Sequence, residues 1–223
     1  MLNYRVWIDD LEHFMATVAS LPGKVEHEIN VAPPLDDAKL KRLNESLRLK
    51  IPGPVERFLR HGSGCCVSHY FWEPPEPEAV QLRRILGRSD VFGGVPLCDS
   101  EKLSQWQEWC VEGATETWIG DEPEDKALWL RAFPFAFMSH GDFLALDLEQ
   151  GAGEPPVVYL CHDEESRILS PSFDEFLAQW KQICYLGPDL HLFENFFDQG
   201  SGYLSGTSGN AKALRSLLGV HGD

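Results

Sequence analysis

Residues 133–162 read FPFAFMSHGDFLALDLEQGAGEPPVVYLCH. Three apolar runs in this stretch have the length of β-strands: 133–138, 143–148 and 157–162. Ser139–Asp142 has the length and composition of a hairpin loop, and Gly151–Pro156 closes the second connection. The stretch therefore predicts an antiparallel meander. Because side chains alternate along a strand, we expect one face of the second run to carry Leu144, Leu146 and Leu148.

Helical patterns flank the meander on both sides. Ser172 with Glu175 three residues later forms a capping box before Phe173, Phe176 and Leu177. We expect the other helices to begin at Asp9 or Asp10, Asp36 or Asp37, Pro54, Glu78, Asp99 or Ser100, and Asn210. A further strand is predicted at 65–72. The chain is thus expected to combine helices with an antiparallel sheet.

The charge of the chain is strongly negative and unevenly distributed. There are 35 Asp and Glu against 19 Lys and Arg, giving a net charge of −16. Residues 101–200 alone hold 20 acids and 5 bases. Such a field repels phosphate backbones and anionic membranes, so we expect neither nucleic acid nor a membrane as partner. A basic protein would be attracted and would associate faster at low salt. Alternatively, the acidity serves only colloidal stability.

Helical periodicity after Ser100 places acidic side chains on one side of the predicted helix, which runs to about Thr117. Glu101, Gln105, Glu108, Glu112 and Glu116 form this stripe, and Leu103, Trp106, Cys110 and Thr117 lie opposite. The usual meaning of such a stripe is a solvated face. The alternative is a surface that binds a partner. That hypothesis assigns partner binding to Glu101, Glu108, Glu112, Glu116, Asp121, Glu122, Glu124 and Asp125.

The six cysteines indicate neither a disulfide framework nor a metal site. Such frameworks belong to short secreted chains, and the start of this sequence lacks the basic and apolar segments of a signal peptide. No CxxC motif and no zinc-type His spacing occurs. No apolar window is long enough for a transmembrane helix. We therefore expect a cytoplasmic protein with reduced, mostly buried thiols, no metal and no cofactor.

The sequence lacks the common catalytic motifs. G-x-S-x-G, the phosphate-binding loop and G-x-G-x-x-G are all absent. The best acid–base candidate is the segment His162–Glu165 at the end of the third run, together with His140 and Asp142 in the hairpin loop. We expect these two groups at opposite ends of adjacent strands and residues 162–166 in a solvated turn. The chain is therefore not expected to be an enzyme, and a hydrolase is kept as a lesser alternative.

Two segments, in order, resemble the SUKH superfamily of Smi/Knr-like domains. The first is Asn44–Leu59 with the turn Gly62–Gly64: an acidic helix, an apolar–proline step, a short helix with an aromatic residue, and a glycine turn. The second runs from Gly141–Asp142 through Leu146–Leu148, Val157–Tyr159 and His162–Asp163 to Ser172–Leu177. This sequence departs from the pattern in having His61–Gly62 where Asn–Gly is usual, and in a long stretch at 65–130.

The resemblance implies a single α+β domain with a mainly antiparallel sheet backed by helices. On this basis 36–187 is the SUKH-like domain, 1–35 an N-terminal helical extension, and 188–223 a C-terminal helical extension packed on the domain. Pro52, Phe58, Ser172, Phe173 and Phe176 match the pattern and are expected to have structural roles. The resemblance brings no catalytic residue.

The function that the resemblance implies is protein binding. Many bacterial members are immunity proteins that neutralise a toxin from their own gene cluster, and fungal members relate to the control of cell-wall synthesis. Together with the charge of −16, this makes the first hypothesis an immunity protein for a basic toxin domain. The alternative is a regulatory scaffold or adaptor of the same fold that has no toxin partner.

Overall fold

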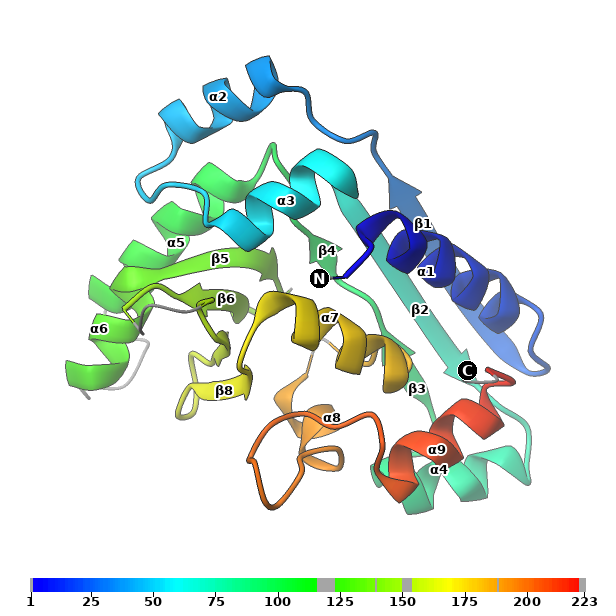
Figure 1. Ribbon diagram of the computed structural model, residues 1–223. Helices are drawn as coiled ribbons and strands as arrows, with labels where there is room; N and C mark the ends of the chain where they lie inside the picture. The colour runs from blue at the N-terminus through cyan, green and yellow to red at the C-terminus, as the bar shows by residue number, and fades with distance from the viewer. Residues whose placement is uncertain (1, 116–122, 139, 150–153, 188, 221–223) are drawn as a thin grey trace. The chain divides into compact units, whose positions relative to one another are not determined.

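The computed structural model describes residues 2–115, 123–138, 140–149, 154–187 and 189–220 (Figure 1). The chain divides into two compact units. The first comprises Met1–Asn30, Val67–Val95 and Leu177–Asp223, and the second comprises Val31–Cys66 and Pro96–Phe176. Helix α7 (Phe173–Gln182) begins in the second unit and ends in the first. The predicted boundaries at residues 35 and 187 stay a prediction.

The first unit has an aromatic core. Its elements are α1 (Tyr4–Ala19), β1 (Lys24–Val31), β2 (Cys66–Glu73), α4 (Glu78–Leu86), β3 (Val91–Gly93), α8 (Leu190–Glu194) and α9 (Gly209–Leu217). Strands β2 and β3 pair antiparallel, and α4 lies beside α9 (Figure 1). The Trp7 and Trp180 rings stack at 6.1 Å, and the Tyr70 hydroxyl donates to the Cys184 carbonyl at 2.7 Å. These contacts join α1, β2 and the end of α7.

Two helix starts in this unit differ from the sequence prediction. Helix α1 begins at Tyr4, because the Asn3 side chain accepts a hydrogen bond from the Val6 amide at 3.3 Å. A start at Asp9 or Asp10 is therefore wrong. Helix α9 is capped by Ser208 and not by Asn210, since the Ser208 hydroxyl accepts from the Ala211 amide at 3.1 Å.

The second unit contains the meander. Its elements are α2 (Asp37–Ser46), α3 (Gly53–His61), β4 (Pro96–Leu97), α5 (Leu103–Thr115), α6 (Pro123–Arg131), β5 (Ala132–Phe137), β6 (Phe143–Asp147), β7 (Val157–Leu160) and β8 (Arg167–Ser170). Strands β4 to β8 pair antiparallel in sequence order. Helix α5 packs on β5 and contacts α6 (Figure 1). The α+β class and the antiparallel meander are confirmed.

The meander is buried on both of its faces. All five residues of β6 are buried, so its side chains do not divide into a buried face and a solvated face. Leu148 lies beyond the end of β6 with 38% of its surface exposed, and its predicted place with Leu144 and Leu146 is wrong. The Phe135 ring meets Phe173 of α7 edge-on at 5.0 Å, and Trp129 of α6 meets Phe143 at 5.9 Å.

The predicted structural roles of the family-like residues are confirmed where the structure shows them. Phe58, Phe173 and Phe176 are fully buried, and the Phe58 and Phe173 rings pack at 5.9 Å. The Ser172 hydroxyl accepts from the Glu175 amide at 3.2 Å, which satisfies an orphan donor in the first turn of α7. Pro52 is the residue before α3, whose first position is Gly53.

Candidate functional site

The acidic stripe lies on the exposed side of α5. Glu108 and Glu112 are exposed, as is Glu101 in the turn before the helix. Leu103, Trp106 and Cys110 are buried on the other side. The predicted division into a solvated acidic side and a buried apolar side is therefore confirmed for the described residues. Partner binding by this side stays a prediction.

The remaining acids of the predicted site lie at and before α6. Glu124 is exposed and Asp125 is half-buried in the first turn of α6, where carboxylates interact favourably with the helix dipole. Glu116, Asp121 and Glu122 lie outside the described residues. The structure thus places the eight predicted residues on two helices and on a segment that it does not describe.

Some acids of the second unit pair with an arginine, whereas the acids of the predicted site that the structure describes form no ion pair. Elsewhere in the second unit, Arg60 pairs with Glu56 at 2.9 Å, and Arg57 pairs with Glu154 at 2.5 Å. Among the residues that the structure describes, no ion pair neutralises the members of the predicted site: Glu101, Glu108, Glu112, Glu124 and Asp125. Their negative charge is consequently available to a partner.

A groove of about 690 Å³ lies beside α6 in the second unit. We call it the α6 groove. One wall is a single side of α6: Glu124, Asp125, Leu128 and Arg131. The other wall is the continuous segment Asp163–Ile168, and Asp147 and Val158 lie between the walls as its buried floor. The Trp129 indole donates to the Ser166 hydroxyl at 3.3 Å, which links α6 to the opposite wall.

Arg131 forms an ion-pair network inside the α6 groove. Its guanidinium donates to both carboxylate oxygens of Asp147, at 2.8 and 3.1 Å, and pairs with Glu149 at 2.8 Å. Burial opposes the charge on Asp147, but the hydrogen bonds from Arg131 and from the Glu149 amide outweigh it and lower the pKa of Asp147. The hydrogen bond to Asp147 in turn raises the pKa of Arg131. This buried acid is therefore locally neutralised.

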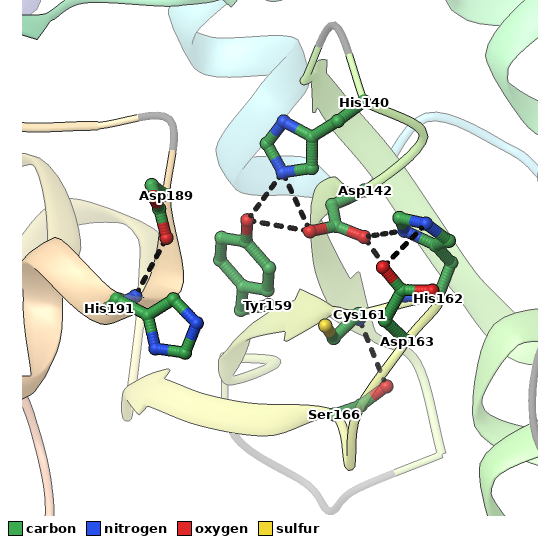
Figure 2. Close-up of polar contacts among 9 residues, drawn as sticks. All are labelled: His140, Asp142, Tyr159, Cys161, His162, Asp163, Ser166, Asp189 and His191. Carbon is green, nitrogen blue, oxygen red and sulfur yellow. Dashed lines mark hydrogen bonds and ion pairs between the residues drawn. The ribbon is translucent and has the colours of Figure 1, made fainter.

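A second polar cluster forms around the carboxylate of Asp142, whose side chain is only 4% exposed (Figure 2). One oxygen, Oδ1, accepts from the His162 amide at 2.9 Å and lies 2.6 Å from His162 Nδ1. The other, Oδ2, accepts from the Tyr159 hydroxyl at 2.8 Å and lies 2.8 Å from His140 Nε2. His162 Nε2 lies 3.1 Å from Asp163. Every lone pair of the buried carboxylate thus has a partner.

The Asp142 cluster corrects the expectation that the two acid–base groups lie at opposite ends of adjacent strands. Strands β6 and β7 are antiparallel, with Phe143 opposite Leu160. The residue before β6 and the residues after β7 therefore lie at the same end of the sheet. Residues 163–165 are exposed as expected for a solvated turn, but His162 is partly buried against Asp142.

The Asp142 cluster can orient imidazole rings and hold protons, as a carboxylate–histidine pair does in hydrolases. The hairpin and the end of β7 are tied together by the same contacts, which is a structural role. Burial raises the pKa of the Cys161 thiol beside the cluster, which disfavours the thiolate that a nucleophilic cysteine needs. Burial and the neighbouring Asp99 likewise raise the pKa of Cys65 to about 12.

The residues that the structure describes contain neither a metal site nor a membrane-spanning helix. In the described ranges, no group of three His, Cys, Asp or Glu side chains is arranged to hold a metal ion. The cysteines are unbridged, and all but the half-buried Cys65 are buried. Within the same ranges, none of the helices has the length and apolar character needed to cross a membrane.

The comparison with known families gives a match over residues 34–179 to the SMI1 / KNR4 family (SUKH-1). Because the match covers more than half of the 223 residues, the chain belongs to this family. Proteins of the family are generally non-catalytic immunity or regulatory domains. No curated protein and no solved structure matches the chain significantly.

Sequence reasoning missed part of this site. The turn Asp163–Glu165 was expected to be only a solvated loop, yet it forms one wall of the α6 groove together with Arg167 and Ile168. Arg131 and Asp147 were not predicted as a pair. The composition held a signal for an acidic partner of Arg131. Residues 101–200 hold most of the excess acid, and Arg131 is one of only five bases there.

Proposed function

We propose that this chain is a non-enzymatic immunity protein that binds and neutralises a basic toxin domain. Its family membership supports the protein-binding part of this proposal. The acidic residues of α5 and α6 would form the surface that meets the toxin. Toxin domains that act on nucleic acids need cationic surfaces to hold phosphates, so an anionic protein is a natural inhibitor of them.

One observation carries the proposal: the exposed acids of α5 and α6 that the structure describes form no ion pair, whereas some other acids of the same unit, such as Glu56 and Glu154, pair with arginines. Charge left unpaired on a folded surface raises the rate of encounter with a cationic partner. Acids that are paired with arginines contribute much less to the electrostatic field that attracts such a partner.

The test is affinity capture from the source strain followed by a growth assay. The tagged chain should retain a basic protein whose expression alone stops growth, and co-expression of the chain should restore growth. A captured partner without toxicity would favour the regulatory adaptor instead. A partner whose binding does not weaken as salt rises would contradict the electrostatic part of the proposal.

Reversing charge on α5 should slow association with that partner. For Glu108→Lys with Glu112→Lys, we expect the association rate constant to fall about tenfold at low salt, because electrostatic steering weakens. Both side chains are exposed, so thermal stability should change little. Stopped-flow or surface plasmon resonance measurements across a salt series would show the effect.

The matched control makes the same change in net charge elsewhere. Glu12→Lys with Glu28→Lys alters two exposed acids of the first unit. Its association rate should fall less than that of the α5 variant at every salt concentration. Equal losses in both variants would show that total charge, and not this surface, attracts the partner.

A further inference from the structure

We propose that the α6 groove receives an arginine side chain of the partner, presented beside an apolar residue. This inference rests on the proposed function and names the partner chemistry at one place on its surface. The groove lies in the second unit between α6 and the segment 163–168, and its volume of about 690 Å³ exceeds that of a single side chain. An inserted arginine together with its neighbour would fill more of it than a lone ion.

Acids occupy both walls of the groove. Glu124 and Asp125 come from α6, and Glu164 and Glu165 come from the facing turn. The resident Arg131 pairs with Asp147 and Glu149, and within the part of the chain that the structure describes it forms no ion pair with these four acids. The Asp163 carboxylate lies 3.1 Å from His162 Nε2. Arg167 is the second arginine among the residues that line the groove. The groove keeps an excess of acids over bases after these pairs are counted.

The groove also has an apolar part, which sets it apart from a plain patch of acids. Val158 is buried in the floor, Leu128 is half-buried, and Ile168 has 37% of its surface exposed. An exposed isoleucine beside carboxylates suits a side chain with an apolar stem and a cationic end. Arginine fits better than lysine, because its planar guanidinium binds carboxylates through two parallel hydrogen bonds and is less strongly hydrated.

The groove is held open before any partner arrives. The hydrogen bond from Trp129 to Ser166 joins its two walls, and the bidentate pair from Arg131 to Asp147 fixes α6 over β6. Ser166 also accepts from the Cys161 amide at 3.4 Å, which restrains the turn that carries Glu164 and Glu165. A groove built on linked elements loses little conformational entropy on binding.

The probe is the peptide acetyl-Gly-Leu-Arg-Gly-amide, titrated into the full chain with methyl groups labelled for NMR. We expect saturable shifts of the Ile168 and Leu128 methyl signals with a dissociation constant on the order of 1 mM. The same peptide with citrulline, which is neutral and nearly isosteric with arginine, should bind about tenfold more weakly. Equal binding of both peptides, or no shift of these methyl signals, would overturn the inference.

Paired variants locate the binding. Glu164→Gln with Glu165→Gln should weaken binding of the arginine peptide several-fold. Glu12→Gln with Glu28→Gln, at two exposed acids of the first unit, removes the same charge and should leave it unchanged, which controls for net charge. If the captured toxin still binds through α5 while the peptide shows no effect, the proposed function stands and the groove inference fails. If no basic partner is captured, the proposed function itself fails.

Discussion

Replacing Asp142 by alanine should lower the free energy of unfolding by about 3 kcal/mol, because several buried partners lose their acceptor together. The Tyr159 hydroxyl and the His162 amide both donate to this carboxylate, and Tyr159 is fully buried. The two histidines lose the carboxylate that lies within 2.8 Å of each ring. Urea unfolding followed by tryptophan fluorescence measures the change.

A matched substitution separates this effect from a general loss of charge. Asp163→Ala removes a carboxylate that also faces His162, but its side chain is 77% exposed. We expect a change below about 0.5 kcal/mol for it. Asp142→Asn should fall between the two, since the amide keeps one acceptor oxygen. If Asp142→Ala is as stable as Asp163→Ala, the hydrogen bonds at Asp142 contribute nothing to folding.

The meander could be predicted from sequence because its signals are local. Three apolar runs separated by glycine-rich or polar connections fit only short antiparallel strands. The caps at Ser172 and Asp36 are likewise specified by neighbouring residues, and each of these side chains accepts a hydrogen bond from the amide three residues later. Elements with such start signals were placed to within a few residues.

Two strands that were missed lack a clear apolar pattern. Strand β1 (Lys24–Val31) has no buried residue, so alternation of apolar and polar side chains does not mark it. Strand β8 has only four residues and follows an acidic turn. For α1 the pattern was present, since Tyr4, Trp7 and Ile8 continue the apolar stripe of Leu11. An aspartate seemed the better cap there, but Asn3 caps the helix.

In the candidate site, too, the features with a local sequence signal were predicted and those that depend on tertiary packing were not. Exposure of Glu108 and Glu112 follows from helical spacing alone and was predicted. The meeting of Asp142 with His162 depends on the antiparallel register of β6 and β7, which places residues twenty apart in the sequence side by side. The α6 groove depends in addition on how α6 packs over the sheet, and no local sequence signal specifies that packing.

Replacing Arg131 by methionine should lower the free energy of unfolding by about 3 kcal/mol near neutral pH. Asp147 is 2% exposed, and the substitution leaves its charge buried without its bidentate partner. Methionine keeps most of the aliphatic volume of arginine, so the loss reflects the missing cation more than missing packing. Denaturant unfolding at several pH values is the measurement.

The pH dependence of this loss has a definite sign. The lowered pKa of Asp147 means that its pairing stabilises the folded protein above the ordinary carboxyl value of 3.8. That stability disappears as the pH falls through the folded-state value, where Asp147 becomes protonated. The difference between the wild type and Arg131→Met should therefore be largest near neutrality and should shrink below about pH 4.

Two further variants decide whether the pair itself is responsible. Arg131→Met combined with Asp147→Leu removes both charges, and it should recover much of the stability that the single change loses. Arg5→Met breaks an exposed pair with Asp9 and should cost less than about 1 kcal/mol with little dependence on pH. A loss in Arg131→Met that is constant from acid to neutral pH, and that the double variant does not recover, would assign the effect of Arg131 to packing alone. The ion pair with Asp147 would then not be the contact that fixes the Arg131 guanidinium in the α6 groove.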